Sequence, residues 1–161
     1  LGDALAIATM KYKKFGKMDF KKLHPAGSLG TQLRTVEDIM ITGKKIPFES
    51  ENLKMNLALK ILTKKKLGIL IVLNNKYKTI GIITDGQIRR FSEKNTNFQS
   101  STVRNIMTKK PITIEKNELA VKALSLMNNK KITSLLVNNK KKPLLTIGVV
   151  HIHTLLRANI A

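Results

Sequence analysis

The 161-residue sequence contains no cysteine at all. This absence excludes a disulfide framework and a thiolate metal site, and it fits a reducing cytoplasm, where we expect the protein to act. No stretch approaches the ~20 consecutive apolar residues that a membrane-spanning helix needs, and no charged segment followed by an apolar one marks a signal peptide. The chain also does not begin with Met, and we expect it to be a fragment of a longer protein.

Acidic residues are scarce, with 10 Asp and Glu against 30 Lys and Arg, a formal net charge of +20. Nucleic-acid binding is one hypothesis for such a charge. However, the lysines are scattered, their runs at 64–66 and 140–142 fall at a helix end and in a turn, and two Tyr and five Phe are too few for a base-stacking platform. We therefore expect no nucleic-acid partner and keep that function as an alternative. The milder inference is a positive field that concentrates anionic ligands.

What the sequence does contain is an internal repeat. "VEDIM" at 36–40 returns as "VRNIM" at 103–107, a shift of 107 − 40 = 67. Between such anchors the shift is 65, since "LIV" at 70–72 matches "LLV" at 135–137. A repeat of this length indicates one supersecondary unit that occurs twice.

Each copy predicts the element order β-α-β-β-α, and the fold class is α/β in the α+β sense. A short strand ("KIPFES" or "PITIE") precedes a helix with apolar residues at helical spacing. Two strands ("GILIVLN" and "TIGIIT" in the first copy) follow and a second helix closes the unit. One such unit has only a marginal core, so we expect units 34–97 and 98–161 to pack as a pair.

The doubled unit resembles a tandem cystathionine-β-synthase (CBS) domain pair, over about residues 34–161. The features that carry the resemblance are the Ile-Met pair before each unit, the "A-L-x-x-[LM]" helix and the "G-[IV]-[IV]-x" strand that leads into a helix. Each motif is short, and their recurrence in the same order makes the resemblance specific.

Residues 1–33 lie outside the repeat. "LGDALAIATMKYKKFG" is helical by pattern, and "HPAGSLG" places His24 in a Gly-Pro loop. From the residues alone, His24 is either structural or an acid–base or phosphate-contacting group. Together with "LGDALA" and "DIM", the segment resembles the C-terminal part of arabinose-5-phosphate isomerases of the KpsF/GutQ type. Residues 1–33 would then be the remnant and linker of a sugar isomerase (SIS) domain, and His24 matches a His of the family's active site.

The resemblance implies a parent enzyme that interconverts ribulose 5-phosphate and arabinose 5-phosphate, for the lipopolysaccharide and capsule sugar Kdo. Because the catalytic domain is absent here, we expect no isomerase activity from these residues alone and no cofactor. The CBS pair is expected to be a regulatory module that binds an anionic nucleotide or a CMP-Kdo-like nucleotide sugar. It would act on its own SIS domain within a homodimer or homotetramer. A purely structural oligomerisation module without a ligand is the alternative.

The expected ligand positions lie in "GIITDGQIRR" (81–90) and its repeat "GVVHIHTLLR" (148–157). In CBS pairs that bind adenine nucleotides this place resembles G-x-x-[ST]-x-x-D, whose hydroxyl contacts a phosphate and whose Asp holds the ribose hydroxyls. Here the first copy keeps Thr84 but has Gln87 for the Asp. The second has His151 and Thr154. We therefore expect AMP and ATP to bind weakly and an anionic sugar nucleotide to bind better.

The same two stretches contain further residues that we expect to bind the ligand or to shape its pocket. The arginines are expected to cluster at the helix starts and donate to phosphate, and Asp85 is placed to cap its helix. His151 and His153 are expected on one face of a strand, as a polar pocket wall or a packed pair; with no third ligand nearby we expect no metal. The expected ligand-binding residues are Thr84, Asp85, Gln87, Arg89, Arg90, His151, His153, Thr154 and Arg157.

Overall fold

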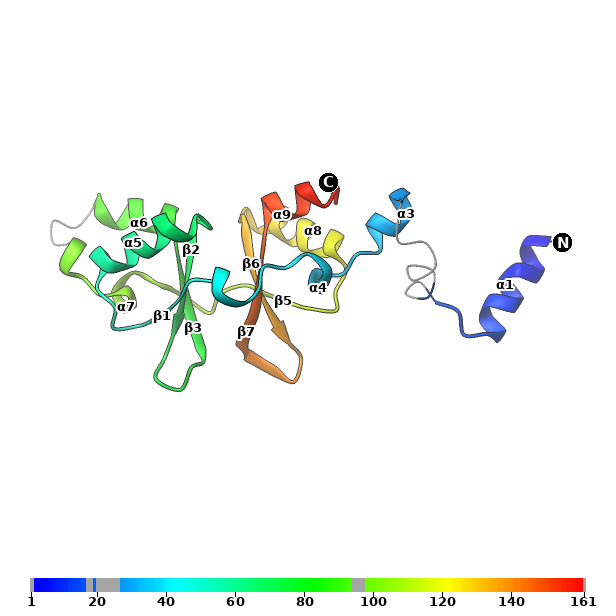
Figure 1. Cartoon of the computed structure of the whole chain (residues 1–161), viewed down its shortest axis with the longest axis horizontal. Coiled ribbons are helices and arrows are strands. Elements are labelled where there is room, and N and C mark those ends of the chain that lie inside the picture. The colour runs from blue at the N-terminus through cyan, green and yellow to red at the C-terminus, as the bar shows by residue number, and fades with distance from the viewer. Residues whose placement is uncertain (1, 17–18, 20–26, 94–97, 161) are drawn as a thin grey trace.

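The structure is a computed structural model that describes residues 2–16, 19, 27–93 and 98–160 (Figure 1). The chain begins with helix α1 (Gly2–Tyr12), followed by α3 (Gly27–Gln32). The helix expected from the first residues is confirmed, and none of its residues is buried. Figure 1 shows α1 standing apart from the rest of the chain. His24 lies outside the described residues.

Two units follow, each with the predicted order β-α-β-β-α. The first unit consists of β1 (Phe48–Ser50), α5 (Met55–Lys65), β2 (Ile69–Leu73), β3 (Thr79–Thr84) and α6 (Asp85–Ser92). The second unit consists of β5 (Thr113–Glu115), α8 (Ala120–Lys130), β6 (Ser134–Asn139), β7 (Lys142–His151) and α9 (Ile152–Arg157). Short elements precede each unit: α4 (Val36–Ile39) and the 3₁₀ turn η1 (Gly43–Lys45), then η2 (Phe98–Ser100), α7 (Val103–Ile106) and β4 (Thr108–Lys109).

Each unit has its own sheet, in which the first two strands run parallel and the next is antiparallel. Strand β2 is apolar on both faces for a clear reason. Leu70 and Val72 pack under α5, whereas Ile69 and Ile71 belong to a cluster shared with the other unit. A strand covered on both sides has a continuous apolar sequence, and the run "GILIVL" predicts such a strand. The shared cluster joins the two units into one body.

The short helices α4 and α7 cross between the units, and we call them the crossing helices. Helix α4 precedes the first unit, yet Val36 is fully buried in the core of the second. Helix α7 precedes the second unit, and Val103 is buried in the core of the first. The strand contacts follow the same exchange, because β4 pairs with β3 and Ile41 pairs with Val149 of β7. Each unit is therefore completed by the segment that precedes its neighbour.

This exchange explains why Met and Gly recur together in the repeat. A Cβ built on Gly81 would lie 2.8 Å from the sulfur of Met107, and one built on Gly148 would lie 2.5 Å from the sulfur of Met40. Each Met thus packs on the Gly of the unit that its crossing helix reaches. We call the residues that follow each crossing helix, 40–41 and 107–109, the crossing segments. A residue larger than Gly would not fit between the strand and the crossing segment unless one of them moved, so packing requires Gly at these two positions.

Two ion pairs fasten the crossing helices, and their charges are reversed between the copies. Glu37 of α4 accepts from Lys116 at 2.7 Å, and Arg104 of α7 contacts Glu51 at 2.9 Å. In the repeat Glu37 corresponds to Arg104, and Glu51 corresponds to Lys116. If each crossing helix docked on its own unit, Glu37 would face Glu51 and Arg104 would face Lys116. The charge pattern therefore favours the exchanged arrangement.

We expect Glu37→Lys to lower the free energy of unfolding by about 0.5–1 kcal/mol, because it sets two cations against each other at a partly exposed site. The double variant Glu37→Lys/Lys116→Glu restores the attraction and should recover most of that loss. Urea unfolding of the three proteins measures both effects. A double variant no more stable than Glu37→Lys would contradict a role for this pair.

The two units meet at a pair of equivalent threonines. Thr79 of β3 and Thr146 of β7 are 67 positions apart (146 − 79 = 67), and their hydroxyl oxygens are 2.8 Å from each other. Both side chains are almost fully buried, at 9% and 7% exposed. Two equivalent residues touch only on a symmetry axis, so this contact marks the pseudo-two-fold axis that relates the units.

Candidate functional site

At the start of α6, the side chains expected to hold a ligand hold one another. The backbone N–H of Thr84 donates to Oε1 of Gln87 at 2.8 Å, and the Thr84 hydroxyl donates to the same oxygen at 3.2 Å. The Gln87 amide nitrogen in turn donates to the hydroxyl of Thr108, in the segment that crosses from the second unit. Gln87 therefore caps its helix and ties down β4. The groups of the first helix start are already engaged within the protein.

The start of α9 is arranged differently. His151 ends β7 and caps α9, because its Nδ1 accepts a hydrogen bond from the backbone N–H of His153 at 3.2 Å. Burial, with a further contribution from the charge of His153, lowers the pKa of His151. The ring is therefore neutral at neutral pH with its proton on Nε2, which leaves Nε2–H as a donor. Thr154 lies half-buried one residue after His153.

A serine that the sequence analysis missed lies beside this histidine. Ser134 is paired with His151 across β6 and β7, so the two side chains share one face of the sheet. The Ser134 hydroxyl is buried and has no hydrogen-bond partner among the residues that the structure describes. A buried polar atom left unpaired is uncommon in a native protein and calls for a partner from outside. The sequence repeat could have pointed to Ser134, because this serine occupies the position where the first unit has the buried, apolar Ile69.

Several expectations for these stretches are corrected by the structure. His153 lies on α9 rather than on the strand, although its ring does stack on that of His151 at 5.0 Å between centroids. Asp85 does not cap α6, because Thr84 occupies the cap and Asp85 is the first helical residue. The arginines do not cluster at the helix starts but belong to the last turns of α6 and α9, and their side chains are exposed: Arg89, Arg90 and Arg157.

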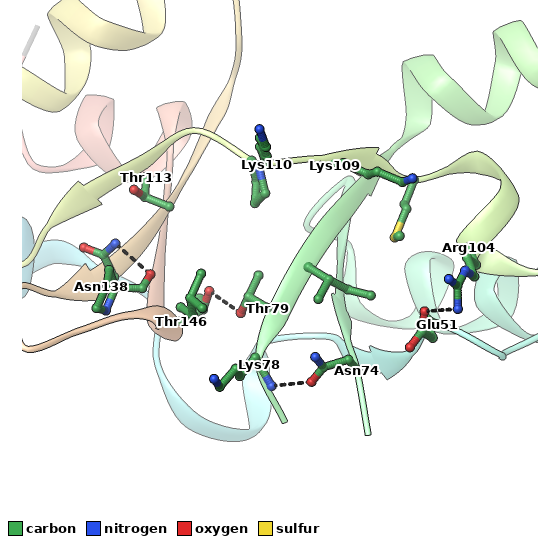
Figure 2. Close-up of a pocket in the computed structure, with 15 residues that line it drawn as sticks. Glu51, Asn74, Lys78, Thr79, Arg104, Lys109, Lys110, Thr113, Asn138 and Thr146 are labelled. Carbon is green, nitrogen blue, oxygen red and sulfur yellow. Dashed lines mark hydrogen bonds and ion pairs between the residues drawn. The ribbon is translucent and has the colours of Figure 1, made fainter. Parts of the chain in front are cut away.

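A cleft of about 690 Å³ lies between the β2–β3 and β6–β7 hairpins (Figure 2). We call it the lysine cleft because Lys78, Lys109 and Lys110 border it. Figure 2 shows Lys109 and Lys110 on the segment above the cleft and the Thr79–Thr146 contact opposite. Within the described part of the chain, none of the three lysines forms an ion pair with a carboxylate. The sequence analysis did not single out any of these residues.

No group of three or more His, Cys, Asp or Glu side chains capable of holding a metal occurs among residues 2–16, 19, 27–93 and 98–160. Over the same residues, no helix has the length and apolarity required to cross a bilayer. The stacked histidine pair is thus not joined by a third ligand in the region described.

The comparison with protein families matches the CBS domain twice, over residues 36–94 and 103–161. These two stretches cover most of the chain and coincide with the two units. The chain belongs to the CBS domain family. The tandem CBS pair that the sequence resembled is thereby confirmed, together with its fold class.

Among curated proteins, this CBS pair is similar over its whole length to arabinose 5-phosphate isomerases named KdsD. The Yersinia pestis protein is 38% identical over 161 residues and the Escherichia coli (strain K12) protein 37%, in each case over 99% of this chain and 48% of the relative. The resemblance to these isomerases is confirmed. The chain spans about half the length of the curated relatives it matches.

Solved structures show the same fold. A conserved protein from Pyrococcus horikoshii has a TM-score of 0.70 at 22% identity and covers 80% of this chain and 93% of its own. CBSX2, solved in complex with AMP, has a TM-score of 0.66 at 20% identity, covering 78% and 96%. The CBS pair of protein MJ0100, solved with 5-methylthioadenosine and S-adenosyl-L-methionine, has 0.68 at 24%, covering 78% and 94%.

Proposed function

We propose that this CBS pair is the regulatory module of a sugar-phosphate isomerase and that it binds a small anionic effector at the start of α9. Similarity to the KdsD isomerases along the whole chain supports the parent activity, arabinose 5-phosphate isomerisation. Other CBS pairs of the same fold have been solved with AMP or with S-adenosyl-L-methionine, which supports a nucleotide or nucleotide sugar as the effector. His24 is the proposed active-site contribution of this part of the chain to the isomerase domain.

One observation carries the binding proposal: the unpaired buried hydroxyl of Ser134 beside the Nε2–H of His151. Together they offer two donors on the face turned toward the other unit. Thr154 stands where a ribose-binding Asp is usual in nucleotide-binding CBS pairs, and its hydroxyl adds a third donor without adding charge. Three neutral donors suit the oxygens of a phosphate or a sugar carboxylate.

The first unit is proposed not to bind at its helix start. Thr84 and Gln87 already satisfy one another and Thr108, so a ligand would have to break three hydrogen bonds there. Each broken bond costs about 1 kcal/mol, which removes most of what a weak ligand would gain. The two copies thus diverge into one helix start that anchors the crossing segment and one that receives a ligand.

Calorimetric titration of the 161-residue protein with AMP and with CMP-Kdo tests the proposal. We expect CMP-Kdo to bind at the start of α9 more tightly than AMP, because its sugar carboxylate offers the three neutral donors an acceptor that AMP lacks. Ser134→Ala should lower the affinity for CMP-Kdo about tenfold, which is the loss expected when one hydrogen bond to a charged group is removed. The same change should leave the ligand-free protein as stable or slightly more stable, since it removes an unpaired buried hydroxyl.

Thr84→Val is the control, because it removes a hydroxyl from the helix start of the first unit, where Thr84 corresponds to His151. It should lower stability slightly and leave the affinity unchanged. CMP-Kdo binding that is unchanged in both Ser134→Ala and Thr154→Ala would sink the proposal. So would an equal loss of affinity from Thr84→Val.

The remaining parts of the proposal concern assembly. Large apolar side chains lie exposed on the outer faces of three helices, Leu57 at 45%, Val121 at 38% and Leu156 at 47%. Exposed apolar surface on helices is often covered by a second copy, so these residues support the expected homo-oligomer. Assembly with an isomerase domain and the expected absence of activity from these residues alone stay predictions, as does the direction of regulation.

A further inference from the structure

We propose that the lysine cleft is a second ligand site, separate from the start of α9, that binds a small phosphate ester between the two units. The cleft has a pseudo-symmetric counterpart on the other side of the Thr79–Thr146 contact, which we call the tyrosine cleft because Tyr77 borders it. The two are alike in size, at about 690 and 650 Å³. Both have Thr79 and Thr146 in their walls. They differ in that the segment from Met107 to Pro111 borders the lysine cleft, whereas its repeat counterpart does not border the tyrosine cleft.

At three equivalent positions the residue is polar in the lysine cleft and apolar in the tyrosine cleft. Lys78 borders the lysine cleft, and its repeat counterpart Leu145 borders the tyrosine cleft. The same replacement occurs along the strands, where Thr113 and Asn138 of the lysine cleft correspond to Phe48 and Leu73. Each cleft also has a glutamate in its wall: Glu51 of the lysine cleft is paired with Arg104 at 2.9 Å, and burial raises the pKa of Glu49 in the tyrosine cleft. Among the described residues, lysines line the lysine cleft and no Lys or Arg lines the tyrosine cleft, so the lysine cleft is the one suited to an anion.

The lysine cleft differs from the tyrosine cleft in a buried polar residue, Asn138, as well as in its exposed lysines. Asn138 is only 7% exposed, in a strand position where the first unit places Leu73, and burying a polar side chain costs free energy unless it is hydrogen-bonded. Its amide nitrogen donates to the carbonyl of Pro143 at 3.1 Å, which fixes the side chain at the edge of the cleft. Such a buried amide keeps further hydrogen-bonding capacity for a ligand.

The lining indicates the class of ligand. Three cations from two different segments suit a phosphate group, since lysines bind phosphate as point charges. Apolar side chains of Met107, Pro111 and Leu144 complete the walls and suit an organic body. A cleft of this size matches molecules as large as a nucleotide, within the ~300–1,000 Å³ usual for small-molecule sites. A sugar phosphate or nucleotide monophosphate combines both features.

A ligand bound in the lysine cleft would stabilise the present arrangement of the two units relative to each other. Lys109 and Lys110 belong to the segment between α7 and β5, whereas Lys78 belongs to the first hairpin and Asn138 to the second. A phosphate held by all three parts would fasten the crossing segment to both hairpins. The start of α9 lies at the opposite end of β7 from the β6–β7 turn, and the two sites share no residue.

The test is a titration of the 161-residue protein followed by amide NMR shifts, with AMP, arabinose 5-phosphate and adenosine as probes. We expect AMP or arabinose 5-phosphate to shift the amides of Thr79, Thr146 and Lys110, and adenosine to leave them in place because it carries no phosphate. Lys109→Gln/Lys110→Gln should weaken this binding at least tenfold, and Lys78→Leu by a similar factor. Leu stands at the equivalent position of the other cleft, so Lys78→Leu fits the fold.

Lys60→Gln/Lys64→Gln is the control, since it removes the same charge from exposed positions of α5 outside the cleft. It should leave the affinity within about twofold of the original. An equal loss in this control would overturn the site, because binding would then follow net charge alone. Millimolar AMP and arabinose 5-phosphate that leave Thr79 and Thr146 unshifted would overturn it as well. Shifts confined to His151 and Ser134 would support the α9 site and refute this one.

Discussion

Gly81→Ala is expected to lower the free energy of unfolding by about 2 kcal/mol, although Ala is normally a better strand residue than Gly. The added Cβ would lie 2.9 Å from the backbone oxygen of Thr108 and 2.8 Å from the sulfur of Met107. Overpacking of this kind costs about 1–3 kcal/mol. The smaller entropy of the unfolded Ala chain returns only about 0.4–1 kcal/mol, so the steric cost dominates.

The loss arises because the crossing strand β4 must move away from β3. Thr108 pairs with Ile82 and Lys109 pairs with Gly81, so displacing the Thr108 carbonyl disturbs the whole contact. A backbone atom cannot rotate aside as a side chain can. Gly148→Ala should therefore cost less, about 1 kcal/mol, because its closest neighbour is the flexible Met40 side chain and the backbone oxygen of Ile41 is 3.3 Å away.

Urea unfolding measures both changes, and a double-mutant cycle isolates their cause. Met40→Ala should relieve most of the strain of Gly148→Ala, whereas Met107→Ala should relieve only part of the strain of Gly81→Ala. Gly86→Ala is the control: its Cβ would meet only Arg90 at 3.5 Å, and it should stabilise α6 by up to ~1 kcal/mol. Stability of Gly81→Ala equal to that of the original protein would show that the crossing segment is not packed on this strand.

The fold could be predicted from the sequence because the repeat contains two copies of each helix and strand, so each element could be predicted twice. The apolar runs of β2 and β3 indicated strands buried on both faces. The structure confirms this for β2, at Ile69 to Val72, whereas buried and half-buried residues alternate along β3. The exchange of α4 and α7 was not predicted. A repeated Ile-Met pair says that the segment packs on something equivalent, but a two-unit repeat cannot distinguish its own unit from the neighbouring one.

The candidate site was harder to predict because its residues act through contacts distant in sequence. Gln87 was interpreted as a lost ribose contact, whereas its amide holds Thr108, 21 positions away. Ser134 and Asn138 were overlooked because single polar residues in apolar strands look like ordinary variation. Their meaning emerges only when each is compared with its repeat counterpart, Ile69 or Leu73, at the same place in the fold.

Thr79→Val is expected to lower the free energy of unfolding by about 1–2 kcal/mol, although Val has the same shape and is more apolar. Thr79 and Thr146 satisfy each other's hydroxyls at the axis between the units. Removing one hydroxyl leaves the other buried without its partner, and such a group costs about 1–3 kcal/mol. Thr146→Val should cost a similar amount for the same reason.

The double variant Thr79→Val/Thr146→Val should be more stable than either single variant, and within about 0.5 kcal/mol of the original protein. Replacing both partners removes the unpaired hydroxyl and leaves two methyl groups in contact across the axis. Chemical denaturation of the four proteins gives the coupling energy directly. Losses that simply add in the double variant would mean that the two hydroxyls do not depend on each other, and that the units are held together by the apolar cluster around Ile71 and Leu136 alone.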